Sequence, residues 1–152
     1  ATDSVSGRAE ACNALGSFTA PGDTAILAAA LKDKSGRVKL AAARALARRT
    51  DPESTAALKA LLEKAPRPEL ALVAQAGLAE RGEDVELGLA DLTLGQGDPE
   101  LKSLAVRVLA AAHRPEALEL LSKALRNDDS RRIRVEAAAA IIVRLRRVGA
   151  PR

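Results

Sequence analysis

The feature that most constrains the fold is an apolar pattern that returns every 31 or 32 residues. In each copy, three apolar or small residues stand four positions apart, the spacing of one face of a helix. The first position holds Gly7, Val38, Leu70, Leu101 and Ile133. The middle position is always alanine, at Ala11, Ala42, Ala74, Ala105 and Ala137. The last position holds Leu15, Leu46, Leu78, Leu109 and Ile141. The pattern predicts five copies of one helix, named here the A helix, with a small residue where it crosses its neighbours.

A second stripe predicts a B helix in each of the first four copies. Its closing leucine follows that of the A helix by sixteen residues, at Leu31, Leu62, Leu94 and Leu125. Pro52 and Pro115 stand where this helix should begin, and proline suits a first turn because its missing N–H has no partner there. Asp51 is the expected N-cap in the second copy. The A helices are expected to begin after N-caps at Ser35, Asp98 and Ser130, with prolines in the first turn at Pro68 and Pro99.

The composition agrees with an all-α chain. Hydrophobic residues make up 47%, yet Phe18 is the one aromatic residue and Trp, Tyr and Met are absent. Alanine and leucine favour helices, and the β-branched and aromatic runs that mark strands are missing. No segment is long and apolar enough to span a membrane. We predict one repeat domain over residues 1–152, with repeats at about 5–33, 34–65, 66–97, 98–129 and 130–147. No signal peptide is recognisable, so a cytoplasmic location is expected, although Ala1 in place of Met leaves an exported or excised chain open.

The second copy, SGRVKLAAARALARRTDPESTAALKALLEKA, resembles the short bacterial HEAT-like repeat first associated with phycobilisome lyase subunits. The shared features are a cap before Arg37 and Val38, an Ala-rich first helix, a turn with Asp51 and Pro52, and a Leu-rich second helix. The resemblance spans roughly residues 5 to 145. It implies a right-handed α-solenoid of four antiparallel helix pairs and a final A helix, with the B helices lining the concave side. Such repeats occur in scaffolds, regulators and accessory subunits of enzymes.

The third copy departs most from the pattern. It has Asp84 where the other three complete copies have proline, and it carries Gly77, Gly82, Gly88, Gly95 and Gly97. Glycine inside a helix costs about 1 kcal/mol relative to alanine. We therefore expect either a looser B helix around Leu87 to Leu94, with a kink or hinge, or an irregularity that the fold tolerates.

Residues able to carry out catalysis are scarce. Cys12 is the one cysteine and His113 the one histidine, which excludes an internal disulfide and a site of several histidines. Cys12 is expected to be a small buried apolar residue, and His113 a solvated turn residue. Asp128 and Asp129 are expected to precede a helix N-terminus, where negative charge is favourable. No catalytic, metal-binding or phosphate-binding motif is present, so we predict neither enzyme activity nor a cofactor.

Positive charge gathers at the C-terminal end. The chain has a net charge of +4, and its last 23 residues hold seven arginines and one glutamate. This end is interpreted either as a solvated cap of the solenoid or as a surface for nucleic-acid phosphates. The lack of aromatic platforms disfavours single-stranded nucleic acid. The same segment has an apolar face with no B helix after it: Ile133, Ala137, Ile141, Ile142 and Leu145. Three explanations are open: the natural chain continues beyond this point, the face packs on the fourth copy alone, or the face docks another chain, which could be a second copy of this one.

The sequence favours a non-enzymatic scaffold whose partner is another protein, bound through outward-facing residues of the B helices. The alternatives are binding of nucleic-acid phosphates through the last helix, and an accessory role in a lyase-type enzyme. The candidate partner-binding residues of the B helices are Lys32, Lys59, Asp91, Glu119, Lys123 and Arg126. Those of the final helix are Arg131, Arg132, Arg144, Arg146 and Arg147.

Overall fold

The computed structural model describes residues 4–18, 20, 22–64 and 66–149, with the backbone alone for residues 147–149. These residues form helices and turns, without a strand. The A helices are α1 (Val5–Leu15), α3 (Gly36–Arg48), α5 (Pro68–Glu80), α7 (Pro99–Ala111) and α9 (Arg131–Gly149). The B helices are α2 (Asp23–Ala30), α4 (Pro52–Leu62), α6 (Gly88–Gln96) and α8 (Glu116–Asn127). The predicted all-α chain of four helix pairs and a final helix is confirmed. None of these described helices is both long enough and apolar enough to cross a membrane.

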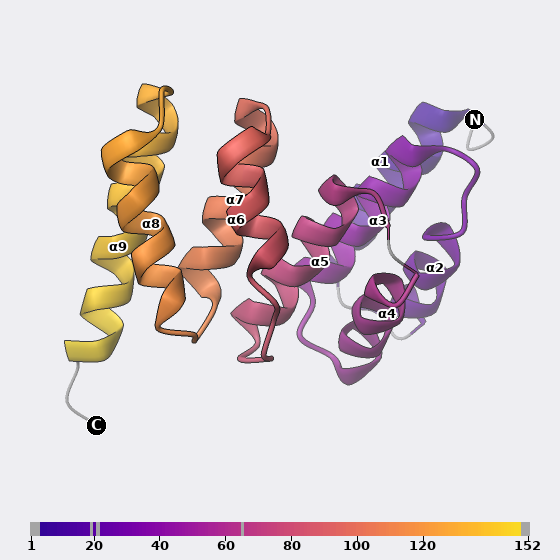
Figure 1. Ribbon diagram of the computed structural model, residues 1–152. Coiled ribbons are helices and arrows are strands. Elements are labelled where there is room, and N and C mark those ends of the chain that lie inside the picture. Colours follow the sequence, from indigo (N-terminus) through magenta and orange to yellow (C-terminus); the bar gives the residue numbers. More distant parts are fainter. Residues whose placement is uncertain (1–3, 19, 21, 65, 150–152) are drawn as a thin grey trace.

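The A helices form a continuous row. Each packs on the next, from α1 through α3, α5 and α7 to α9, so α1 and α9 lie at opposite ends of the array (Figure 1). Every B helix packs more extensively against the A helix that follows it than against its own. The B helices therefore join successive repeats, and α9 packs against α8 as well as α7. Among the described B helices, α2 and α4 also contact each other, whereas α4 with α6 and α6 with α8 do not make comparable contacts.

Small residues let the A helices approach closely. The four alanines of the middle column that follow Ala11 are fully buried, while Ala11 itself is exposed on the first helix. The α3–α5 contact is one close example. A Cβ at Gly77 would lie 2.7 Å from the Cβ of Ala47 and 2.9 Å from its Cα. Glycine at this position is therefore a requirement of helix packing, because no heavy atom beyond the backbone fits there.

Most helix starts follow the predicted signals. Asp51 accepts a hydrogen bond from the N–H of Ser54 at 2.8 Å, and Pro52 opens α4. Asp98 caps α7 by accepting from two N–H groups of its first turn. Ser35 occupies the N-cap position of α3, but its side chain makes no capping hydrogen bond. The N-terminus of α5, which follows Arg67, also lacks a side-chain cap.

The irregularity of the third repeat lies before its B helix. Gly82 has a φ of 82°, the left-handed region that favours glycine. The N–H of Glu83 donates to the carbonyl of Leu78 and that of Gly82 to Ala79, which is a Schellman ending of α5. Residues 83–87 are then non-helical, and α6 runs unbroken from Gly88 to Gln96. The expected kink or hinge within the helix is thus replaced by a late start.

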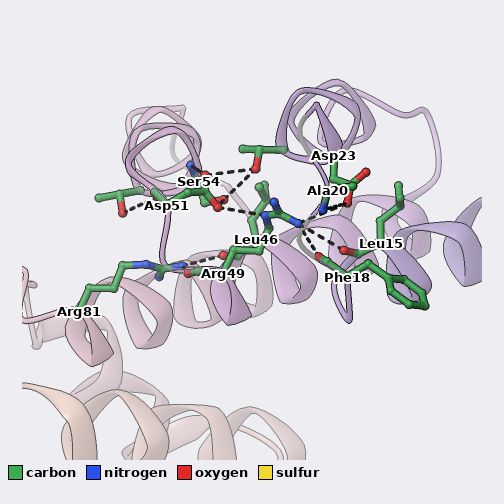
Figure 2. A network of polar contacts seen from close by, with 11 residues as sticks. Leu15, Phe18, Ala20, Asp23, Leu46, Arg49, Asp51, Ser54 and Arg81 are labelled. Atoms are coloured by element: carbon green, nitrogen blue, oxygen red, sulfur yellow. Dashed lines mark hydrogen bonds and ion pairs between the residues drawn. The ribbon is translucent and has the colours of Figure 1, made fainter.

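Arginines bind the C-terminal ends of three A helices, α1, α3 and α7. These are Arg49, Arg81 and Arg144, each three residues after the last residue of the apolar stripe of its own A helix. Each side chain reaches the C-terminus of the preceding A helix (Figure 2 shows the first two). Arg49 donates to the carbonyls of Leu15 (3.4 Å) and Phe18 (2.7 Å), Arg81 to those of Leu46 (2.7 Å) and Arg49, and Arg144 to those of Leu109 (2.9 Å) and Ala112. The last carbonyls of a helix have no intrahelical partner, so each arginine stabilises one helix end and joins two repeats.

Arg49 also anchors a buried ionic cluster at the start of two B helices (Figure 2). Its Nε donates to Asp51 Oδ2 at 3.0 Å, and its Nη1 lies 3.7 Å from Asp23 Oδ2. Burial alone would raise the pKa of Asp51, but hydrogen bonds from the Ser54 backbone and hydroxyl, from Arg49 and from Thr24 hold that pKa well below its usual range. The cluster therefore connects α2, α3 and α4.

The fourth copy has Ala112 at the position of these arginines, so no arginine of the next repeat reaches the end of α5, where Arg81 itself donates to the carbonyl of Gly77. The Schellman turn at Gly82 supplies donors to the last carbonyls of α5 instead. Arg114 reaches back to the non-helical segment and binds Asp84 through two hydrogen bonds of 2.7 Å and Glu86 through one of 3.0 Å. The missing arginine is thereby compensated within the chain.

Candidate interaction surface

The candidate residues predicted on the B helices are exposed, with Lys32 placed just beyond the end of α2, and some of them form ion pairs within the chain. Lys59 Nζ lies 2.8 Å from Glu83 Oε2 in the segment before α6. Lys123 Nζ lies 3.6 Å from Asp91 Oδ1, which joins α8 to α6. The remaining three form no ion pair with a described residue: Lys32, Glu119 and Arg126.

The candidate arginines of α9 fall into two groups. Arg132 lies between Glu100 and Glu136, at 2.9 and 2.8 Å, and Arg144 binds the end of α7. Arg131 and Arg146 are exposed and make no ion pair with a described residue. The side chain of Arg147 lies outside the described residues. Part of the predicted basic end is therefore used in contacts within the chain.

The apolar face of α9 is only partly covered. Ile133 and Ala137 are fully buried and Ile141 is partly buried, in the core shared with α7 and α8. Ile142 and Leu145 are 50% and 55% exposed. The inner side of the helix packs on the fourth repeat, as one of the three interpretations expects, and the outer side remains uncovered in this chain.

Cys12 and His113 are the residues with reactive side chains. Cys12 is buried, and burial, followed by the nearby Asp33 carboxylate, raises the pKa of its thiol. His113 is exposed in the turn between α7 and α8. Both placements agree with the sequence prediction. Within the described residues, no group of three or more His, Cys, Asp and Glu could hold a metal ion.

An apolar groove lies between α2 and α4, which stand side by side in Figure 1. Its lining is Ala25, Ala28, Ala29 and Leu31 on the α2 side and Ala57, Ala60 and Leu61 on the α4 side. The hollow measures about 520 Å³. Lys32 and Lys64 complete the lining, so the groove has an apolar floor and cations at its edge.

A second hollow adjoins the groove and is basic. Lys34, Lys39, Lys64 and Arg67 line it together with apolar residues and glycine, and the lining contains no acidic residue. Lys39 is half-buried, and the other three cations are exposed. None of the four forms an ion pair with a described residue. We name this hollow the basic pocket, and the basic pocket and groove together the α2–α4 surface.

The acidic residues nearest in sequence leave the charge of the basic pocket uncompensated. Arg8 Nε binds Asp33 Oδ2 at 2.8 Å, and this hydrogen bond, with that from the Ser35 N–H, holds the pKa of Asp33 below its usual range. Lys34, the next residue, contributes a weaker charge interaction to that lowering. Glu69 lies 3.6 Å from Arg44, and Glu63 is exposed at the end of α4.

The repeats show why Lys39 lacks a carboxylate. In the first repeat Arg8 binds Asp33, and in the fourth Lys102 binds Asp128 at 2.8 Å. In both repeats the cation directly follows the first residue of the apolar stripe, and the aspartate stands five residues before the next stripe. In the second repeat the cation is Lys39, but Ala65 occupies the position of the aspartate. In the third repeat both positions are uncharged, Ala71 and Gln96.

The hollow between α6 and α8 has the opposite charge balance. Asp91, Asp128 and Asp129 line it with Lys102 and Lys123. Both of these lysines form ion pairs, with Asp128 and Asp91 respectively. Burial opposes ionisation of Asp128, but hydrogen bonds from Lys102 and the Ser130 N–H lower its pKa. The two halves of the chain thus present one basic and one acid-rich hollow.

Sequence reasoning did not find the cations of the basic pocket. The sequence signal for them comes from comparing two positions of each repeat. One position directly follows the first residue of the apolar stripe, and the other stands five residues before the stripe of the next repeat. The first position holds Arg8, Lys39, Ala71 and Lys102, and the second holds Asp33, Ala65, Gln96 and Asp128. One cation without an acidic counterpart stands out only when the two are aligned.

A family model described as HEAT repeats matches residues 1–79. The matched region extends from α1 almost to the end of α5, so it includes the whole α2–α4 surface. No curated protein matches the chain.

Proposed function

Because the chain belongs to the HEAT repeats family, we propose that it is a non-enzymatic scaffold that binds another protein through the α2–α4 surface. HEAT repeats are generally protein-interaction scaffolds, and rows of stacked helix pairs offer extended surfaces for a partner. The observation that supports this surface is an apolar groove adjoining cations that form no ion pair within the described chain. An apolar centre with a polar rim is the usual anatomy of a protein interface.

The α2–α4 surface is preferred over the full set of candidate residues predicted on the B helices. At Lys59 and Lys123 the charges are already neutralised by Glu83 and Asp91. A partner would have to displace these ion pairs before binding, which adds a desolvation cost. Lys32 belongs to both sets, since it is one of those candidate residues and lines the groove.

Binding of nucleic-acid phosphates through α9 is the weaker alternative. Arg132 and Arg144 are engaged within the chain, so fewer cations face solvent than the sequence suggests. This alternative predicts a mobility shift of duplex DNA at low salt that is lost in Arg131→Gln/Arg146→Gln. The accessory lyase role predicts an absorbance change when the chain is mixed with bilin and an apoprotein.

Site-specific photo-crosslinking in the source cells tests the proposed function. A photoreactive amino acid at Ala29, exposed in the groove, should give a discrete covalent adduct with another protein. The same amino acid at Glu116, exposed at the start of α8, is the matched control. Adducts of equal yield at both positions, or at Glu116 alone, would contradict binding through the α2–α4 surface.

A further inference from the structure

We propose that the α2–α4 surface binds an acidic amphipathic segment of the partner protein, with carboxylates in the basic pocket and aliphatic side chains in the groove. This inference rests on the proposed function and specifies the chemistry of the partner. It follows from three features of the surface: a cation without its repeat partner, the sign of the surrounding charge, and the apolar floor beside it.

The first feature is Lys39. Its counterparts Arg8 and Lys102 each bind an aspartate supplied by the loop at the end of their own repeat, at 2.8 Å in both cases. Lys39 is half-buried at the same repeat position, and the second repeat supplies Ala65 instead. A half-buried ammonium without a carboxylate has lost part of its hydration without compensation. A carboxylate from another molecule, placed where the aspartate stands in the other repeats, would restore the pair.

The second feature is the charge around Lys39. Lys34, Lys64 and Arg67 line the same pocket, and none forms an ion pair with a described residue. The pocket also lies beside the start of α3, whose N-cap Ser35 makes no side-chain hydrogen bond and whose first turn has no acidic residue. The partial positive charge of a helix N-terminus has the same sign as the lysines. The pocket is therefore complementary to more than one carboxylate.

The third feature is the groove, which distinguishes an acidic peptide from a simple anion. Leu31, Leu61 and Lys64 line both hollows, so the apolar floor begins where the cations end. The alanines of α2 and α4 leave a hollow of about 520 Å³ that aliphatic side chains would fill. A nucleic acid would gain nothing from this floor, because the groove offers no aromatic platform for its bases.

Selection from a displayed random peptide library tests the inference on the intact chain. α4 has 11 residues and spans about 16 Å, so peptides of about twelve residues are long enough to follow the groove. The expected result is enrichment of peptides that combine Asp or Glu with Leu, Ile or Val. A selection that yields no binders, or binders without acidic residues, overturns the inference.

Ala65→Asp is the decisive variant for the selected peptides, measured by fluorescence anisotropy. At the aligned sequence position it returns the aspartate that the first and fourth repeats already have, so we expect Lys39 to gain an internal partner and the positive charge of the pocket to fall. We expect affinity to fall about tenfold, the scale of a charge contact at an interface. Gln96→Asp makes the same charge change at the equivalent position of the third repeat and should alter affinity by less than about twofold. Equal effects of the two variants would contradict the proposed role of Lys39.

A second pair of variants covers the case in which Ala65→Asp does not fold. Lys39→Gln removes the cation itself, and Arg37→Gln removes an exposed cation of the same helix that lies outside the basic pocket. Only Lys39→Gln should weaken the peptides, again by about tenfold. Unchanged binding by Lys39→Gln would overturn the inference even where the groove still binds peptides.

Other possible ligands of the α2–α4 surface would each give a different experimental result. Light scattering that shows concentration-dependent oligomers, abolished by Ala65→Asp, would assign the surface to a second copy through the acid-rich α6–α8 hollow and overturn the inference. The inference would also be overturned if the chain sedimented with vesicles of anionic phospholipid. The same holds if inorganic phosphate, at the concentration of the peptide, inhibited peptide binding. A crosslinked partner at Ala29 without acidic selected peptides would leave the proposed function intact and reject this inference alone.

Discussion

Replacing Gly77 by alanine adds one methyl group to the contact between α3 and α5. The new Cβ would lie 2.7 Å from the Cβ and 2.9 Å from the Cα of Ala47. Both distances are far below the roughly 3.5–4.0 Å at which carbon atoms attract each other. The Cα belongs to the backbone and cannot rotate away, so one helix must shift relative to the other. Gly77→Ala is therefore expected to destabilise the fold, although alanine is the better helix former.

The sign follows from comparing two magnitudes. Alanine is favoured over glycine inside a helix by about 1 kcal/mol. Overpacking a tight contact costs about 1–3 kcal/mol, and a backbone clash belongs to the upper part of that range. The free energy of unfolding of Gly77→Ala should therefore fall by about 1–2 kcal/mol, which lowers the melting temperature by about 2–4 °C for each kcal/mol.

Gly95→Ala is the matched control, because it is also a helical glycine and a Cβ there would meet no heavy atom within 4 Å. This variant should gain about 0.5–1 kcal/mol. Urea and thermal unfolding are followed by far-UV circular dichroism, since the chain has neither tryptophan nor tyrosine for fluorescence. If both substitutions raised the midpoint, the contact between α3 and α5 would have room for a methyl group, and the close approach at Gly77 would be refuted.

Three further predictions concern the polar network and the buried thiol. Arg81→Met removes the side-chain donor from the carbonyls of Leu46, which keeps the Arg49 N–H, and of Arg49. It should cost about 1–3 kcal/mol in urea unfolding, whereas Arg107→Met, which breaks an exposed pair with Glu80, should cost less than about 1 kcal/mol. The pKa of Asp51 is lower in the folded chain than its unfolded value of about 3.9, so the unfolded state binds protons first and stability falls as the pH drops below that value. Asp51→Asn should flatten this fall in acid titrations of the urea midpoint, and an unchanged slope would contradict the assigned network. Cys12 is buried with a raised thiol pKa, so it should react with iodoacetamide far more slowly in the native chain than in urea, and equal rates would contradict its burial.

The repeat architecture could be predicted because residues at the same position of successive repeats serve the same structural purpose. An alanine recurring at the centre of an apolar stripe indicates a helix crossing, and its burial in four of the five copies confirms that interpretation. The start of α6 could not be predicted in the same way. Leu78 and Leu94 keep the constant spacing of sixteen residues, yet the helix begins at Gly88. The backbone turns at Gly82 with a positive φ, and spacing alone does not reveal which glycine adopts it.

The candidate site was harder to predict than the fold because side-chain charge has no period. Outward-facing lysines on a helix give the same signal whether or not a carboxylate neutralises them. The partner of Lys59 is Glu83, which lies in the next repeat beyond α5, and no spacing within a helix indicates that pair. Lys34 and Lys64 come from loops on either side of the second repeat, and the packing of the helices brings both to the lining of one hollow.

The two departures from the repeat pattern have different consequences. At Ala112 an arginine that closes an A helix is missing, and the chain compensates through the Schellman turn at Gly82 and the bonds from Arg114. At Ala65 an aspartate that neutralises an A-helix cation is missing, and no described residue forms an ion pair with Lys39. The missing arginine is thus compensated by other residues of the same chain. For a cation without its counterpart beside an alanine-lined groove we propose an explanation outside the molecule: a carboxylate of a partner protein would complete the pattern of the first and fourth repeats.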